Sequence, residues 1–306
     1  MPESEYHIPV LLHKSVDGLN IKPDGIYADL TFGGGGHAQE ILKHLKKGKL
    51  FAFDQDEDVT KRANELYKEF PGKFFFFKAN FEYFSNFLHY AGYKSIDGIL
   101  ADLGVSSHQF NDSERGFSFR FDGIPDMRMN RKAKKSSVDI LNEYEEEELI
   151  SIFRTYGEIK SAKKLSAAII HKREIKKIET LKQLNSLIDE VIKTQKKNKI
   201  YAQIYQALRI ETNNETYVLK KMLSQSVNCL NSGGRLVVLS YHSLEDRLVK
   251  NFIKFHNFDG LQKKDIYGNP EKYFKEINKK VIVPDEEEIE KNNRSRSAKL
   301  RIAEKI

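Results

Sequence analysis

Four consecutive glycines, Gly33 to Gly36, separate an apolar segment that contains Asp29 from a segment with a helical pattern. A glycine-rich turn between a strand and a helix lets a ligand approach the backbone, and it presents free N–H groups at the start of the helix. The next apolar segment ends in Asp54, where a carboxylate can accept hydrogen bonds from ribose hydroxyls. These residues predict a binding site for a cofactor that carries a nucleoside and an anionic group.

Two cofactors fit this turn. Gly33 and Gly35, followed by Ala38, satisfy the looser form of the dinucleotide fingerprint, which favours a nicotinamide cofactor. Asp29 stands inside the first strand just before the turn, and the order Asp-x-Thr-x-Gly-x-Gly resembles the first motif of S-adenosylmethionine-dependent methyltransferases. This acid favours the methyl donor, and a turn that only caps a helix is the alternative without a ligand.

A further acid, Asp102, stands near the end of the apolar segment Ile96–Leu103. In open α/β sheets, ligands bind beyond the carboxyl ends of the parallel strands, so we expect Asp102 beside the glycine turn. The position predicts a catalytic carboxylate, with a buried structural aspartate as the alternative.

A parallel sheet is needed to bring these strand ends together. The first hundred residues alternate strand-like and helical patterns, as βαβ units do. Between 137 and 205 the pattern is helical throughout, and the α/β rhythm then returns. The sequence predicts an α/β protein with two sheet-forming parts, 1–130 and 211–306, and an inserted helical domain, 131–210. We expect strands at Ile26–Phe32, Lys49–Asp54, Lys73–Lys78, Ile96–Leu103, Arg235–Ser240 and Ala298–Ala303, and helices near 37–47, 57–70 and 213–230.

Composition excludes several classes of protein. The 306 residues are 40% hydrophobic and 31% charged, as in a globular chain. The apolar runs are far shorter than the ~20 residues of a membrane-spanning helix, and residues 1–5 lack the pattern of a secretory signal. We therefore expect a cytoplasmic protein without a membrane partner. Cys229 is the only cysteine, which excludes an internal disulfide and a multi-thiolate zinc site, and no metal is expected.

The positive charge of the chain is concentrated in one segment. Residues 131–209 hold 18 Lys/Arg and 11 Asp/Glu, which is the whole excess of +7, because the rest of the chain has 33 of each. A local basic surplus favours a polyanionic partner such as RNA, and a solvated lysine-rich helical surface is the alternative.

Short motifs along almost the whole chain resemble those of one family. They are Tyr6–Leu12, Asp29–His37, Ala101–Gln109, Arg115–Phe119, Pro125–Met129, Gln206–Ile210, Ser240–Arg247 and Arg294–Arg301. On these motifs the chain resembles the RsmH (MraW) family, bacterial enzymes that methylate N4 of a cytosine in the decoding region of 16S, small-subunit, ribosomal RNA. The resemblance implies a Rossmann-like class I methyltransferase sheet with an inserted all-helical substrate-recognition domain, S-adenosylmethionine as methyl donor, and the small ribosomal subunit as partner. It suggests a nearly mature subunit as substrate and leaves room for a homodimer.

The resemblance also implies a set of donor contacts. Carried over residue by residue, they fall on Gly35, Gly36, His37, Asp54, Phe81, Asp102 and Gln109. Asp54 would hold the ribose, Phe81 would lie against the adenine, and Asp102 would stand near the methionine end. For Phe81, core packing is the alternative, because Phe84 and Phe87 follow it at helical spacing.

Methylation of an amino nitrogen needs its lone pair aimed at the sulfonium methyl, but it needs no covalent intermediate. An acceptor such as Asp102 can orient the amino group, and positioning then supplies most of the rate. Cys229 is expected in the helix before Gly233, away from the strand ends, which disfavours the thiolate attack of C5 methylation. Many N4 methyltransferases place Pro-Pro-aromatic after this acid, but here Leu103-Gly104-Val105 follows. The ring that stacks on the base must come from elsewhere, and the candidates are Phe117, Phe119 and Tyr241.

Side chains suited to RNA contact flank the predicted site. The segment from Arg115 to Phe121 interleaves guanidinium and aromatic groups, which hold phosphates and stack on bases; buried rings with solvated cations are the alternative. His242 is a candidate general base, and a hydrogen-bonded structural histidine is its alternative. The substrate-binding candidates are Ser106, Arg115, Phe117, Phe119, Arg120, Tyr241, His242, Arg294 and Arg296.

Two rival functions remain. One is a nicotinamide-dependent oxidoreductase on the same fold, which Asp29 and the basic insert disfavour. The other is a non-catalytic RNA-binding protein that keeps a cofactor pocket, which the combination of the glycine turn, Asp54 and Asp102 disfavours.

Overall fold

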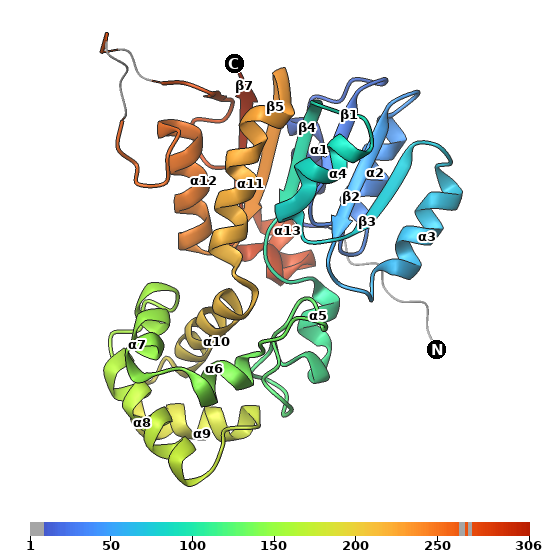
Figure 1. Ribbon diagram of the computed structural model, residues 1–306. Helices are drawn as coiled ribbons and strands as arrows, with labels where there is room; N and C mark the ends of the chain where they lie inside the picture. The colour runs from blue at the N-terminus through green and yellow to red at the C-terminus, as the bar shows by residue number, and fades with distance from the viewer. Residues whose placement is uncertain (1–8, 263–266, 269–270) are drawn as a thin grey trace. The chain divides into compact units, whose positions relative to one another are not determined.

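The chain forms two compact units in the computed structural model (Figure 1). The model describes residues 9–262, 267–268 and 271–306, so the expected features at residues 1–5 and Tyr6–Ile8 lie outside the described residues. Unit 1 joins the residues up to Gly104 with those from Tyr217 onward, and unit 2 is Val105–Thr216.

Unit 1 is built on a seven-stranded sheet with the order β3-β2-β1-β4-β5-β7-β6. Strands β1 to β5 run parallel, and β7 is antiparallel to both β5 and β6. This confirms the α/β class. The order reverses between β1 and β4, which are direct neighbours, so the carboxyl ends of these two strands flank the switch point where open sheets bind ligands. The strands are β1 (Ile26–Asp29), β2 (Lys49–Asp54), β3 (Phe74–Lys78), β4 (Ile96–Asp102), β5 (Leu230–Ser240), β6 (Phe274–Glu276) and β7 (Lys299–Lys305).

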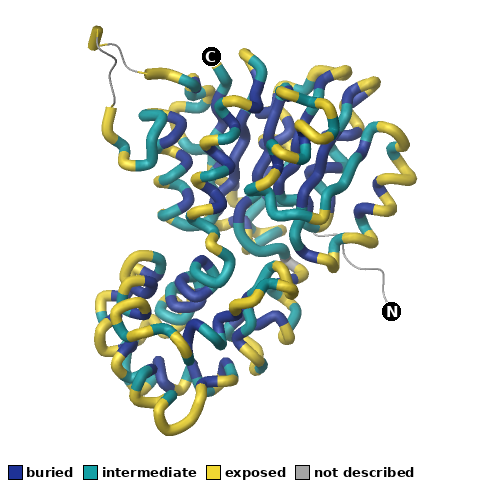
Figure 2. Tube along the Cα trace, viewed as in Figure 1, coloured by how far each residue is buried: buried dark blue, intermediate teal, exposed yellow. Residues whose placement is uncertain are grey.

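Helices cover both faces of this sheet. Successive side chains of a strand point to opposite faces, and each face packs against its own set of helices. In β4, Ile99 and Ala101 belong to one core cluster, together with residues of α4, α11 and α12, while Leu100 belongs to a second cluster with residues of α1, α2 and α3. The central strands are accordingly buried (Figure 2). The helical segments of unit 1, of which α11 begins at the end of unit 2, are α1 (Leu12–Gly18), α2 (Gly36–His44), α3 (Thr60–Glu69), η1 (Phe81–Tyr83), α4 (Phe84–Tyr90), α11 (Glu215–Cys229), α12 (Ser243–Phe255), α13 (Glu286–Lys291) and η3 (Asn293–Ser297).

Unit 2 is helical and has its own apolar core. Its bounds differ from the expected 131–210, because the connection that follows β4 packs into this core. Phe117 is 5% exposed and Met127 is fully buried, and both pack with residues of α6 to α10. The elements are α5 (Ser107–Asn111), η2 (Ser113–Arg115), α6 (Ser137–Glu143), α7 (Glu146–Thr155), α8 (Ala162–Ile175), α9 (Leu181–Val191) and α10 (Lys197–Asn213).

The expected strands lie within a few residues of the observed ones. The first strand ends at Asp29 and not at Phe32. The Thr31 N–H donates to Asp29 Oδ1 at 3.1 Å and not to a neighbouring strand, whereas the N–H groups of Leu30 and Phe32 still donate to the carbonyls of Leu100 and Phe53 at 2.9 Å. Within the described part of the chain, no helix is long and apolar enough to cross a membrane.

Candidate active site

The glycine turn adopts a conformation that other residues rarely take. Gly33 and Gly35 have φ angles of 48° and 75°, in the left-handed region. The Gly33 N–H donates to Asp54 Oδ2 at 2.8 Å, which ties the turn to the end of β2. A Cβ placed on Gly34 would meet no atom within 4 Å, so the backbone there faces open space. Gly36 then begins α2. The backbone at Gly34 is therefore open to the approach of a ligand, and binding of a cofactor there stays a prediction.

Two carboxyl groups border the turn. Asp29 is fully buried; Thr31 N–H occupies its Oδ1, whereas its Oδ2 has no hydrogen-bond partner among the described residues. Burial, aided by the charges of Asp102 and Asp54, raises the pKa of Asp29 to about 7. Burial also raises the pKa of Asp54 to about 6, although backbone N–H groups of Asp56 and Gly33 oppose the shift. An unpartnered buried acceptor is costly, so this edge favours a ligand that brings a donor or a positive charge.

Asp102 ends β4 with both carboxylate oxygens near side chains of unit 1. The Tyr241 hydroxyl donates to Asp102 Oδ1 at 2.7 Å, and His37 Nδ1 lies 3.9 Å from Oδ2. The Asp102 backbone N–H donates to Thr31 Oγ1 at 2.6 Å, which ties the end of β4 to the turn after β1. Burial raises the pKa of Asp102 to about 7; the Tyr241 hydrogen bond lowers this pKa and the charge of Glu245 raises it. The carboxylate is thus held in place and titrates near neutrality.

His37 follows the glycine turn in the first turn of α2. It is 6% exposed, and burial lowers its pKa to about 4, although an interaction with the Val10 backbone opposes the shift. The imidazole is therefore neutral at pH 7, so it adds no positive charge beside Asp102.

Phe81 and Gln109 complete the expected donor contacts. Phe81 begins η1 after β3, and its half-buried side chain packs against the core cluster that contains Phe84. Gln109 lies in unit 2, where it is 5% exposed and forms a capping box with Ser106: the Ser106 N–H donates to Gln109 Oε1 at 3.0 Å, and the Gln109 N–H donates to Ser106 Oγ at 3.2 Å. The donor role of both residues stays a prediction.

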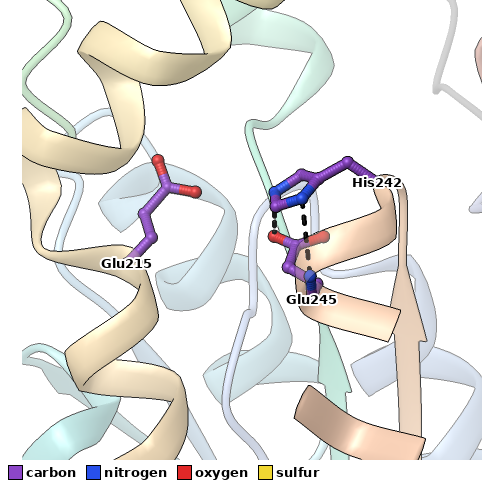
Figure 3. Close-up of side chains that lie close together, drawn as sticks. All are labelled: Glu215, His242 and Glu245. Carbon is purple, nitrogen blue, oxygen red and sulfur yellow. Dashed lines mark hydrogen bonds and ion pairs between the residues drawn. The ribbon is translucent and has the colours of Figure 1, made fainter. Parts of the chain in front are cut away.

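Tyr241 and His242 follow β5. Tyr241 is half-buried, packs against the second core cluster and donates its N–H to Glu245 Oε2 at 3.0 Å. His242 is the N-cap of α12, where its Nδ1 accepts the Glu245 N–H at 3.4 Å and its Nε2 lies 3.1 Å from Glu245 Oε1 (Figure 3). His242 thus has the structural role that was the alternative to a general base. Glu215, the third side chain drawn in Figure 3, pairs with Arg209 within unit 2.

The structure corrects the substrate role predicted for Arg115 and Phe117. Arg115 is 2% exposed and donates from Nη2 to the carbonyls of Arg128 and Met129 at 3.0 and 3.1 Å. Phe117 lies in the core of unit 2. Neither side chain offers a surface to phosphate or base, because this loop folds onto apolar helices and its guanidinium satisfies backbone carbonyls.

The other substrate-binding candidates have different surroundings. Phe119 is half-buried against the rings of Tyr201 and Tyr205, with centroids 5.4 and 5.8 Å away, so little of its face is free for stacking. Arg120 is exposed in unit 2, and Arg294 and Arg296 are exposed on η3 in unit 1. Arg120 and Arg296 are therefore exposed cations that a polyanion can reach.

Sequence reasoning missed how Asp102 is fixed. It treated Tyr241 as a ring for stacking, whereas the hydroxyl is the group that reaches Asp102. It also gave no role to Thr31, the threonine of the Asp-x-Thr-x-Gly pattern, whose hydroxyl accepts from the Asp102 N–H. The Asp-x-Thr-x-Gly pattern could have indicated this contact, because Thr31 follows β1 and Asp102 ends the adjacent strand β4.

The described geometry suits transfer of a group to a neutral nucleophile. One oriented acceptor with a pKa near 7 can hold an N–H or O–H donor and take a proton. Cys229, in contrast, is 3% exposed at the end of α11, and burial raises its pKa to about 11, so it is not a thiolate nucleophile at neutral pH.

Along almost its whole length, the chain is similar to proteins of one family. The model of the MraW methylase family matches residues 4–306. A protein named ribosomal RNA small subunit methyltransferase H from Christiangramia forsetii is 54% identical, covering 99% of this chain and 98% of the relative. Proteins of the same name from Flavobacterium johnsoniae and Parabacteroides distasonis are 55% and 52% identical, over 99% of this chain and 98% and 99% of theirs.

Proposed function

Because the chain belongs to the MraW methylase family, we propose that it transfers a methyl group from S-adenosylmethionine to the exocyclic N4 of a cytidine in the decoding region of 16S ribosomal RNA. The observation that carries the chemical part of this proposal is the Asp102 carboxylate at the carboxyl end of β4, hydrogen-bonded to Tyr241 and close to the residue after the glycine turn.

The residues around the turn fit the donor. Open space at Gly34 and the left-handed glycines leave the backbone free for approach, and Asp29 Oδ2 offers a buried acceptor without a partner. S-adenosylmethionine supplies an electrophilic methyl group on a positively charged sulfur. The residues assigned to hold it are Gly35, Gly36, His37, Asp54, Phe81, Asp102 and Gln109.

Asp102 would act on the acceptor base. Its carboxylate accepts a hydrogen bond from the N4 amino group, which turns the nitrogen lone pair away from the ring system and toward the methyl group. Orientation of this kind is a large part of the rate enhancement available to a displacement reaction. The methylated nitrogen then carries a surplus proton, and a carboxylate with a pKa near 7 can accept it.

RNA recognition is assigned to exposed cations. Arg120 of unit 2 and Arg294 and Arg296 of unit 1 can bind phosphates, and the lysine-rich helices of unit 2 supply a general attraction to the polyanion. We place the reaction in the cytoplasm on the small subunit. A homodimer stays a prediction, which light scattering of the purified chain would test.

The test is incubation of the purified chain with methyl-labelled S-adenosylmethionine and small subunits that lack the modification, followed by digestion and identification of the labelled nucleoside. We expect label in N4-methylcytidine, its loss in Asp102→Ala, and full activity in Asp17→Ala, which changes an exposed aspartate of α1. Label in another nucleoside would refute the substrate assignment. Binding of a nicotinamide dinucleotide without any methyl transfer would favour the oxidoreductase, and RNA binding without cofactor binding would favour a non-catalytic protein.

A further inference from the structure

The short segment Pro9-Val10-Leu11, which precedes α1, is fixed by a carboxylate from the other end of the chain. The Leu11 N–H donates to Glu288 Oε1 at 2.6 Å, across 277 sequence positions. Leu11 is 2% exposed and has a φ of 49°, in the left-handed region that residues with a Cβ seldom adopt. The apolar side chain of Leu11, the N-cap residue of α1, forms no capping hydrogen bond of its own. The conformation of the segment therefore depends on a partner outside the segment.

The same segment packs against residues that follow the glycine turn. Pro9 lies so close to Gly36 that a Cβ on Gly36 would be 2.2 Å from Pro9 Cγ. Val10 is buried, and its backbone interacts with the His37 side chain. Gly36 and His37 are both assigned to the donor, so a displacement of Pro9 or Val10 would reach the donor site directly.

Glu288 is more buried than the acidic residues that precede it on α13. Its backbone N–H donates to Asp285 Oδ1 at 3.0 Å, and its side chain is half-buried, whereas Glu286 and Glu287 are exposed. Its charge also contributes to the raised pKa of Tyr241, so it lies near the residue that binds Asp102. The Glu288 carboxylate can therefore stabilise the segment before α1. The exposed acids of α13 only stabilise the first turn of α13 itself.

We propose that Glu288 is a positioning residue of the methyl-donor site: by binding the Leu11 N–H, it holds Pro9 and Val10 against Gly36 and His37. Only the identity of the ligand rests on the proposed function. Glu288 itself touches neither the donor nor the RNA in this proposal, so its effect is confined to the affinity for the donor.

The test compares Glu288→Met, which keeps the volume and removes the acceptor, with Glu288→Gln, which keeps an acceptor oxygen, and with Glu286→Ala as the control on the same helix. Calorimetry with S-adenosylhomocysteine measures donor-site affinity without any turnover. We expect Glu288→Met to bind up to about tenfold more weakly, because the lost hydrogen bond to a charged acceptor contributes about tenfold or more and only the part of it that orders Pro9 and Val10 reaches the donor site. Glu288→Gln should recover most of the affinity, and Glu286→Ala should match the unmodified chain. With small subunits, Glu288→Met should raise the KM for S-adenosylmethionine and leave kcat nearly unchanged.

A folded Glu288→Met variant that binds S-adenosylhomocysteine as tightly as Glu286→Ala would overturn the proposal. If Glu288→Met does not fold, hydrogen exchange of the unmodified chain tests whether the segment that Glu288 binds is coupled to the donor site. Because coupling between two sites is reciprocal, bound S-adenosylhomocysteine must slow exchange in the peptide that contains Leu11. Unchanged exchange there would also refute the positioning role. Tight S-adenosylhomocysteine binding without N4 methylation would instead contradict the proposed function and leave the role of Glu288 intact.

Discussion

Removal of one hydroxyl group, in Tyr241→Phe, should shift the pH dependence of methyl transfer toward alkaline pH. The Tyr241 hydroxyl donates to Asp102 Oδ1 at 2.7 Å, and this hydrogen bond lowers a pKa that burial has raised to about 7. The proposed reaction needs the ionised carboxylate. A donor that stabilises the ionised form therefore extends activity to lower pH, and its loss must do the opposite.

The size of the shift follows from the strength of the bond. A hydrogen bond to a charged group contributes about 1.5–3 kcal/mol, and one pKa unit corresponds to ~1.4 kcal/mol, so the pKa of Asp102 should rise by about one to two units. Without the charge of the donor, the ionised fraction at pH 7 would fall from about one half to between about a tenth and a hundredth. Near pH 9 the loss should shrink to about twofold or less.

The assay is single-turnover methylation of small subunits at saturating S-adenosylmethionine, between about pH 6 and 9. The sulfonium charge lowers the pKa of Asp102 in both proteins, so the displacement between the two profiles is the quantity that tests the reasoning. Tyr90→Phe, which changes a tyrosine that is 89% exposed, is the control. Tyr241→Phe keeps the ring, so an unchanged profile would leave only a stacking role for Tyr241. An equal loss at every pH would also refute the argument.

Further predictions concern the turn, the core of unit 2 and the RNA. Gly35→Ala should weaken S-adenosylhomocysteine binding about tenfold in calorimetry, since the left-handed conformation costs about 1–2 kcal/mol and the new Cβ would lie 2.8 Å from Phe32 Cζ. Phe117→Ala should lower the free energy of unfolding of unit 2 by about 3–5 kcal/mol in urea titrations; a loss of RNA affinity without a loss of stability would contradict its core position. The double variant Arg294→Ala, Arg296→Ala should reduce the slope of log affinity for ribosomal RNA against log salt by about one to two, and an unchanged slope would exclude both as phosphate ligands.

The sheet and its glycine turn could be predicted because their signals are local. Short apolar runs, the strand ends at Asp54 and Asp102 and the run of glycines are each recognisable from a few neighbouring residues, and the parallel topology then brings the strand ends to one edge. The start of unit 2 could not be predicted in this way. The residues from Val105 to Met129 look like a polar loop, and only the tertiary packing of Phe117 and Met127 into the helices assigns them to that unit.

Side-chain roles were harder to predict than strand ends, because a role depends on partners that are remote in sequence. The Arg and Phe residues from Arg115 to Phe119 have the composition of an RNA-binding loop, yet Arg115 donates to backbone carbonyls and Phe117 is core. Similarly, an aromatic side chain after β5 suggests stacking, whereas 139 positions separate Tyr241 from the carboxylate that it binds. The type of a side chain limits the contacts that it can make, and its burial in the fold determines which of those contacts it makes.

The acids beside the glycine turn explain why this site suits a cationic donor. Burial raises the pKa of Asp29, Asp54 and Asp102, and the charges of the other two raise the pKa of Asp29 further. The neighbouring His37 is neutral at pH 7, so it adds no positive charge. A folded protein that keeps such groups partly protonated stores unfavourable electrostatic energy. A positive charge bound beside these carboxyl groups would lower their pKa values, so a charged donor would gain affinity that a neutral ligand of the same shape would not. When the methyl group has left, the sulfonium charge is gone, and the same electrostatics weaken the hold on the product. The arrangement thus favours both binding of the charged donor and departure of the neutral one.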